Sequence, residues 1–152
     1  VDIVLASPFT AVHAAVEAAR ALPFRFLLTA RAENLIRNVN DLDDTIRRLQ
    51  AYEKAGADVL YAPGIADVAM LRTVLASISK PFNLLISSAN ATMTVADARA
   101  AGARRISVGG ALARAAATGF INAAHEIAQY GTFRYGEGLA GKKEMQDFLK
   151  PR

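Results

Sequence analysis

The sequence lacks cysteine and tryptophan and contains only two histidines. Without cysteine the chain has neither a disulfide framework nor a thiolate metal site, and two distant histidines do not favour a zinc centre. No apolar run reaches the roughly 18 residues of a membrane-spanning helix, and no charged segment precedes an apolar stretch at the amino terminus. These absences predict a protein of the reducing cytoplasm with no membrane partner.

The charge is weakly basic and evenly spread. Eighteen Lys and Arg residues against 14 Asp and Glu residues give a net charge of +4. The basic residues occur singly or in pairs, without the interleaved aromatic residues of a nucleic-acid-binding surface, so we expect no nucleic-acid partner. With 152 residues, of which 53% are hydrophobic, the chain is long enough to bury a sizeable core.

Apolar runs of strand length alternate with segments of helical period. The runs are FRFLLTA (24–30), ADVLYAP (57–63), PFNLLIS (81–87) and RISVGG (105–110), with VDIVLA (1–6) as a candidate fifth. Each run is nearly continuous, which predicts parallel strands that are covered on both faces. The helical segments are 41–56, 65–79, 93–102, 111–130 and 141–151. Gly56 and Gly102 end two of them, where left-handed C-caps are expected.

Two α/β architectures fit this alternation, an open doubly wound sheet and a (β/α)₈ TIM barrel. An open sheet would usually carry a glycine-rich nucleotide motif after its first strand, and none is found. In a barrel, functional polar residues lie at the carboxyl ends of the strands. The residues at those ends are Arg31, Glu33, Tyr61, Ser87, Ser88, Gly109 and Gly110. The barrel is therefore the predicted fold.

The number of strands is too small for a closed barrel. Such a barrel needs eight strands and about 250 residues, whereas the sequence offers four or five. We therefore predict that the chain represents the second half of a barrel, strands 5 to 8 with their helices. Residues 1–136 would form this half, and 137–152 a glycine-rich linker with a terminal helix.

Gly109 and Gly110 precede the helical segment 111–130. Backbone N–H groups at a helix start can bind an anion, as they often do after a late barrel strand. Glycine also lets a strand turn tightly into a helix. The sequence leaves both interpretations open.

Several segments together resemble a known superfamily. FRFLLTARAEN, DLDDTIRRLQAYEKAGADVLYAPG, SKPFNLL and RRISVGGALARAA are similar to the second half of the isocitrate lyase and phosphoenolpyruvate mutase superfamily. The similarity is greatest to its phosphonomutase-like and methylisocitrate lyase-like members. It implies a magnesium-dependent barrel enzyme that acts on small 2-oxo or 2-hydroxy carboxylates or on phosphonates, by C–C or P–C bond chemistry. It also implies a tetramer in which the terminal helix is exchanged between subunits.

The resemblance also assigns substrate-binding residues. Arg31 matches an arginine that holds a substrate carboxylate or phosphonate, and Glu33 follows it as in the phosphonomutase-like members. Arg114 matches an arginine used against a second carboxylate, although a solvent-facing helical arginine is the alternative. Asn83 occupies the position typical of KPxN members, and its amide could instead pair with backbone.

The sequence also departs from the family. The paired magnesium-binding aspartates and the mobile gate, which precede the fifth strand in the family, are not visible, so no metal ligand is predicted within this chain. Pro63 stands where methylisocitrate lyases carry a glutamate, which argues against that activity. The alternative function is therefore a catalytically inactive binding or structural barrel fragment.

Other polar residues have plain structural interpretations. His13 and His125 lie on helical segments without a partner ligand. Asp41, Asp43 and Asp44 precede a helix, where Asp41 can cap and the others complement the positive helix end. A Schiff-base aldolase would need a lysine at a strand end. The lysines lie elsewhere, at Lys54, Lys80, Lys142, Lys143 and Lys150.

Overall fold

The computed structural model describes residues 8–150, so the candidate strand 1–6 lies outside the described residues. The chain divides into two compact units between Gly109 and Gly110. Each unit is treated by itself below. The boundary between residues 136 and 137 that the sequence suggests stays a prediction.

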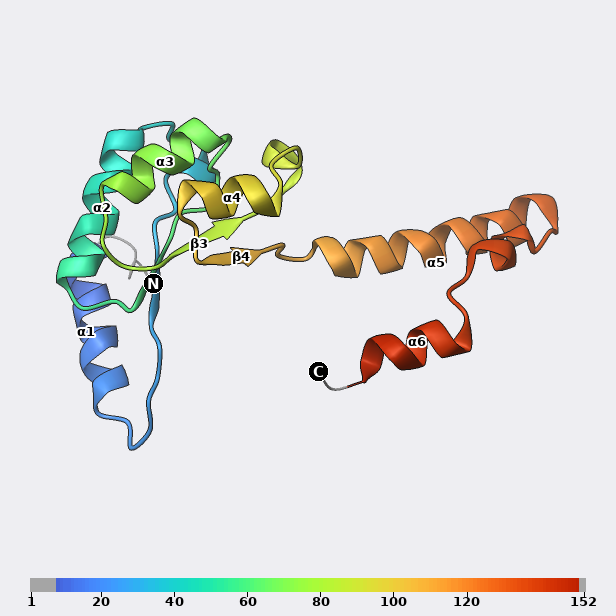
Figure 1. Cartoon of the computed structure of the whole chain (residues 1–152), viewed down its shortest axis with the longest axis horizontal. Coiled ribbons are helices and arrows are strands. Elements are labelled where there is room, and N and C mark those ends of the chain that lie inside the picture. The colour runs from blue at the N-terminus through green and yellow to red at the C-terminus, as the bar shows by residue number, and fades with distance from the viewer. Residues whose placement is uncertain (1–7, 151–152) are drawn as a thin grey trace. The chain divides into compact units, whose positions relative to one another are not determined.

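The first unit is an α/β unit built on a parallel sheet (Figure 1). Its elements are α1 (Pro8–Arg20), β1 (Thr29–Arg31), η1 (Leu35–Arg37), α2 (Leu42–Lys54), β2 (Val59–Tyr61), α3 (Val68–Ala76), β3 (Phe82–Leu85), η2 (Ser88–Asn90), α4 (Val95–Ala101) and β4 (Arg105–Ser107). The four strands pair in the order β1-β2-β3-β4, and every pair is parallel. Figure 1 shows α3 and α4 along the same side of β3 and β4. The α/β class and the parallel sheet are thus confirmed.

The strands are shorter than the apolar runs predict, most clearly in β1, which begins at Thr29 instead of residue 24. The chain before Asp58 belongs to α2 and its turn, so among the described residues no strand lies beside residues 24–27. The backbone pairing of β1 with β2 stops at Leu28. There the Leu28 N–H donates a hydrogen bond to the Asp58 carboxylate at 2.8 Å. Phe24 is consequently 62% exposed.

The core lies between the strands and the helices. Its largest fully buried side chains include Leu49 of α2, Leu60 of β2, Leu71 of α3, and Phe82 and Leu84 of β3. Burying a side chain of this kind contributes about 1.5 to 3 kcal/mol.

The prediction that every strand is covered on both faces is wrong for β1, β2 and β4 in this structure. In β1 and β2 the middle residue, Ala30 or Leu60, is buried, while its neighbours are only partly buried or exposed. No residue of β4 is fully buried. Successive side chains of a strand point to opposite faces, and the helices seen here cover one face.

Helix ends follow the expected chemistry. Asp41 caps α2 by accepting a hydrogen bond from the Asp44 N–H at 2.7 Å, which confirms its predicted role. Thr94 and Asp97 form a reciprocal capping box at α4. Gly56 and Gly102 have φ angles of +99° and +102°, so both adopt the left-handed conformation predicted for them.

The second unit contains α5 (Ala111–Tyr130), η3 (Arg134–Gly138) and α6 (Lys142–Leu149). The Glu126 carboxylate fixes the turn after α5 by accepting hydrogen bonds from the Thr132 hydroxyl and the Arg134 N–H, both at 2.6 Å. In residues 8–150, no helix is long and apolar enough to cross a membrane.

Candidate functional site

Four residues, one from each strand, are paired across the sheet in a single row. The register pairs Arg31 with Tyr61, Tyr61 with Asn83, and Asn83 with Arg105. Residues paired across parallel strands point to the same face. A polar row therefore crosses the sheet, and Arg31 and Tyr61 are the last residues of their strands. For β1 and β2 this is the carboxyl end, where barrel enzymes place their sites, whereas Asn83 is the second residue of β3 and Arg105 the first of β4. We call these four residues the Arg31 row.

Arg31 is held by two neighbours. Its Nε forms an ion pair with Glu33, and its guanidinium carbon lies 5.2 Å from the centre of the Tyr61 ring. That distance is within the range of a cation–π contact. The side chain remains 44% exposed, and its two Nη groups make no hydrogen bond with the residues that the structure describes. A planar fork of donors is thus available for a carboxylate or phosphonate.

Glu33 lies between two arginines. One oxygen of its carboxylate faces Arg31, and the other lies 3.6 Å from Nε of Arg37. The sequence predicted Glu33 as a supporting residue, and its contacts make it the resting partner of Arg31. Since the pair is partly exposed, its net contribution to stability is about 0 to 1 kcal/mol. An incoming anion could therefore displace Glu33 at little cost.

Asn83 is 3% exposed and makes a side-chain contact within the sheet. Its amide donates a hydrogen bond to the Ser107 hydroxyl at 2.9 Å, so the pairing with backbone considered from the sequence is not found. Its Oδ1 has no hydrogen-bond partner among the described residues. Sequence reasoning missed Ser107 and Arg105, because only the strand register shows that they lie beside Asn83.

Asn34 anchors the segment that follows β1. This residue is 7% exposed, and its amide donates to the Thr45 hydroxyl at 2.5 Å and to the Asp41 carbonyl at 3.3 Å. Both partners belong to the start of α2. The contacts therefore fix the chain just beyond Arg31 and Glu33 against a helix end, a role that no sequence motif indicated.

The remaining predicted site residues surround the junction of the two units. Gly109 belongs to the first unit and has a φ of +51°, while Gly110 caps α5 in the second. Arg114 lies in the first turn of α5, and one Nη atom would come 3.4 Å from a Cβ at Gly110. Their anion-binding and substrate-binding roles stay predictions.

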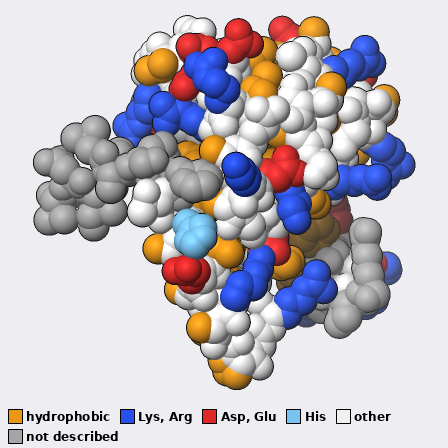
Figure 2. Space-filling model, turned by 90° about the vertical axis from the view of Figure 1, so that its left-hand side faces the viewer, with side chains coloured by type: hydrophobic (Ala, Val, Ile, Leu, Met, Phe, Trp, Pro, Cys, Tyr) orange, Lys and Arg blue, Asp and Glu red, His pale blue; other side chains and the backbone are white. Residues whose placement is uncertain are grey.

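The described residues do not provide a magnesium site. No group of three or more His, Cys, Asp or Glu residues lies together among residues 8–150. Asp44 forms ion pairs with Arg47 and Arg48, and the hydrogen bond from Arg48 is the main cause that lowers the pKa of this carboxyl. On the face seen in Figure 2, basic and acidic side chains are intermixed.

Comparison with known proteins identifies the family to which the chain is similar. The family model of phosphoenolpyruvate phosphomutase matches residues 4–128. A proposed lyase/mutase from Burkholderia cenocepacia J2315 has 44% identity and a TM-score of 0.86 over 95% of this chain and 52% of that one. For 2,3-dimethylmalate lyase the identity is 25% and the TM-score 0.74, over 93% of this chain and 49% of that one.

One curated relative has a different named activity from the two solved structures. Oxaloacetate decarboxylase of Bradyrhizobium diazoefficiens is 39% identical over 80 residues, which are 53% of this chain and 27% of the relative. The chain spans about half the length of the two solved structures described above. The match of the family model over most of the sequence shows that the chain belongs to the phosphoenolpyruvate phosphomutase family.

Proposed function

We propose that the chain forms the carboxylate-binding half of an enzyme that cleaves C–C or P–C bonds in small 2-oxo or 2-hydroxy acids or phosphonates. The observation that carries the proposal is Arg31, a partly exposed guanidinium at the carboxyl end of β1 whose Nη groups make no hydrogen bond with the described residues. Relatives described as oxaloacetate decarboxylase and phosphonopyruvate hydrolase act on small acids with a 2-oxo group. A paired hydrogen bond to a carboxylate or phosphonate is the recognition that such substrates share.

The described residues have distinct parts in this binding. Arg31 receives the anionic group as Glu33 moves aside, and the Tyr61 ring keeps the guanidinium plane in place. Asn83 lies one strand further along the same row, and its unpartnered Oδ1 can accept a hydrogen bond from a substrate hydroxyl or from water. For Gly109 and Gly110 we propose anion binding at the start of α5, and for Arg114 the substrate-binding role that the resemblance implies.

The complete fold in this proposal is a (β/α)₈ barrel, to which this chain contributes strands 5 to 8. Coverage of about half of each similar structure supports that assignment. A bound Mg²⁺ would supply charge stabilisation for the reacting oxygen. Its ligands must come from outside the described residues, which hold no suitable cluster. The proposed enzyme is cytoplasmic and tetrameric.

The alternative is a barrel fragment that binds acids but has no chemistry of its own. The lack of a carboxylate cluster among residues 8–150 favours it. Both functions require anion binding at Arg31, and they differ in turnover.

Turnover assays decide between the two. We expect the complete barrel that contains this chain, with magnesium present, to release pyruvate from oxaloacetate or inorganic phosphate from phosphonopyruvate. Binding of oxalate without release of either product would contradict the enzymatic proposal and support the inactive fragment. No binding at all would contradict both.

A further inference from the structure

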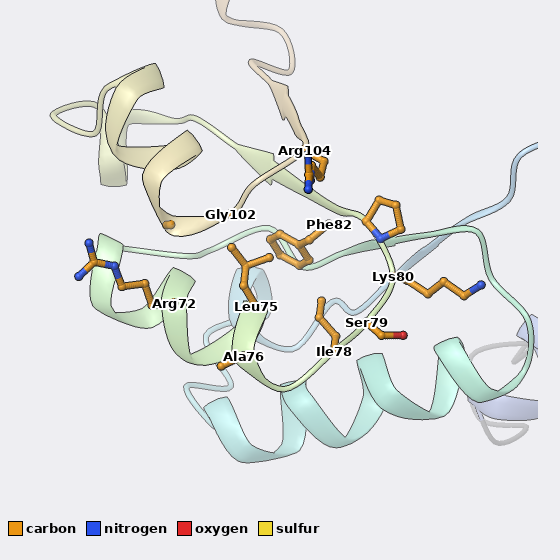
Figure 3. Close-up of a pocket in the computed structure, with 11 residues that line it drawn as sticks. Arg72, Leu75, Ala76, Ile78, Ser79, Lys80, Phe82, Gly102 and Arg104 are labelled. Carbon is orange, nitrogen blue, oxygen red and sulfur yellow. The ribbon is translucent and has the colours of Figure 1, made fainter.

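A cavity of about 420 Å³ lies between the ends of α3 and α4 and the segments that lead into β3 and β4 (Figure 3). The cavity lies at the amino-terminal ends of β3 and β4, whereas Arg31 and Tyr61 are the last residues of β1 and β2. We call it the Phe82 cavity. A volume of this size is typical of small-molecule sites.

The floor of the Phe82 cavity is apolar. Leu75 of α3, Ile78 of the following loop and Phe82 of β3 contribute it. Figure 3 shows these three side chains gathered in the middle of the group. Phe82 is 1% exposed and belongs to the main core. Phe82 thus offers almost no free surface, and the apolar surface on which a ligand can pack comes from the partly buried Leu75 and Ile78.

The rim carries positive charge only. Arg72, Lys80 and Arg104 line the cavity, and none of the lining residues is acidic. Within residues 8–150, these three cations form no ion pair or side-chain hydrogen bond. A basic residue can also be favoured by the dipole of a helix, but only in the last turn of that helix. The last turn of α3 has no basic residue, so the dipole of α3 does not explain the three cations.

The carboxylates near the rim are engaged by other groups, and that of Glu53 accepts hydrogen bonds from Ser79 of the lining itself. The hydrogen bond from Arg20 is the largest cause that lowers the pKa of Asp58, and Lys80 contributes less. For Asp97 the largest cause is the Thr94 hydroxyl. Neither carboxylate lines the cavity, so the cations of the rim remain available to an external anion.

The loop between α3 and β3 is held in place before any ligand arrives. Gln50 of α2 donates a hydrogen bond to the Ser77 carbonyl at 2.9 Å. The Glu53 carboxylate accepts one from the Ser79 N–H at 3.1 Å and a second from the Ser79 hydroxyl. Because the loop is anchored at both points, binding in the cavity needs little additional ordering.

We propose that the Phe82 cavity binds a small organic anion that combines a flat apolar body with a phosphate or carboxylate group. The body packs on Leu75 and Ile78, and the anionic group lies by Lys80 and Arg104, whereas Arg72 lies at the opposite edge and points away from Lys80 (Figure 3). This site is separate from the Arg31 row and does not depend on the proposed function.

The test uses the whole chain and phenyl phosphate, followed by two-dimensional NMR. We expect binding with a Kd of about 1 mM, since a ligand with few atoms makes few contacts. The shifted amides should be those of Ile78, Ser79, Lys80, Phe82 and Gly102. Benzoate distinguishes a preference for carboxylate from one for phosphate. Inorganic phosphate and benzyl alcohol each supply half of the recognition, and both should bind more weakly.

Alanine variants of the rim cations test whether these side chains bind the phosphate group. Lys80→Ala and Arg104→Ala should each weaken phenyl phosphate binding about two- to fivefold, and the double variant by their product. Arg99→Ala, which removes a cation of α4 outside the lining, is the matched control and should bind as the parent does. Arg31→Lys should also leave phenyl phosphate binding unchanged.

The proposal is overturned by any of three results. These are the absence of shifts at the residues that line the Phe82 cavity, a double variant that binds as tightly as the parent, and phenyl phosphate that binds no better than benzyl alcohol. Failure of oxalate to bind would count only against the function proposed for Arg31, and not against the site in the Phe82 cavity.

Discussion

At the scale of the residue, the site depends on contacts that hold a few side chains beside Arg31. Arg31 is a strand-end arginine in the sequence, and its place could be predicted because apolar strand residues give way there to polar ones. Its surroundings could not be predicted in the same way. Ser107 is 24 residues from Asn83 in the chain, and their hydrogen bond depends on the register of β3 and β4.

Asn34 is the first residue to test. Replacing it with alanine removes the amide that bonds Thr45 and the Asp41 carbonyl. These two partners then keep only the hydrogen bonds that Thr45 donates to the Asp41 carbonyl. We expect Asn34→Ala to lower the free energy of unfolding by about 1 to 3 kcal/mol, measured by urea denaturation. It should also weaken oxalate binding, because Arg31 and Glu33 lie just before it. Asn40→Ala, at an exposed position, is the control. Equal stability in the two variants would contradict the role of Asn34.

Gly64 has a φ of +107°, and a Cβ there would lie 2.8 Å from the Cβ of Leu35. Gly102 has a similar φ of +102°, but its nearest contact is 3.7 Å away. Both alanine variants suffer backbone strain of about 1 kcal/mol or more. We expect Gly64→Ala to lose more stability in thermal melts, because it also displaces Leu35. A larger loss for Gly102→Ala would refute this explanation.

At the scale of the element, periodicity located the helices well and the strands less well. The helix predicted at 111–130 spans Ala111–Tyr130 in the structure. The strand predicted at 24–30 is confined to Thr29–Arg31, because a strand needs a neighbour as well as apolar residues. That neighbour begins only after Asp58, which the sequence of the first run cannot reveal.

Asp58 joins α1 to the start of the sheet. Its carboxylate accepts hydrogen bonds from Arg20 and from the Leu28 N–H, each at 2.8 Å, and the Arg20 bond is the main cause that lowers the pKa of Asp58. A carboxyl whose pKa is lower in the folded state stabilises the fold above its unfolded pKa of about 3.9. This contribution is lost as the pH falls through the lower, folded value.

We therefore expect Asp58→Asn to have a lower free energy of unfolding than the parent at neutral pH. This difference in free energy should shrink below about pH 4. Urea denaturation across this pH range measures it. Asp43→Asn, at an exposed position, serves as the control. A stability difference that stays constant down to acid pH would mean that the charge of Asp58 contributes nothing.

At the scale of the whole molecule, the second unit presents many large apolar side chains when taken by itself. Phe120, Phe133, Leu139 and Phe148 are each more than 60% exposed within it. The sequence predicts that the terminal segment 137–152 packs on a neighbouring subunit. Removing this segment should convert an oligomer into smaller or aggregated species on light scattering. An unchanged particle size would refute the exchange.

The central claim is that Arg31 binds the anionic group of the substrate. Calorimetry with oxalate on the parent, Arg31→Lys and Arg37→Lys tests it most directly. Lysine keeps the charge but loses the paired donors, so Arg31→Lys should weaken binding by about 1.5 to 3 kcal/mol for each charged hydrogen bond lost. Arg37 also faces Glu33 but has a side chain that is 77% exposed, and Arg37→Lys should bind oxalate as the parent does. Equal affinity in the parent and Arg31→Lys would contradict the claim and make Arg31 a structural residue.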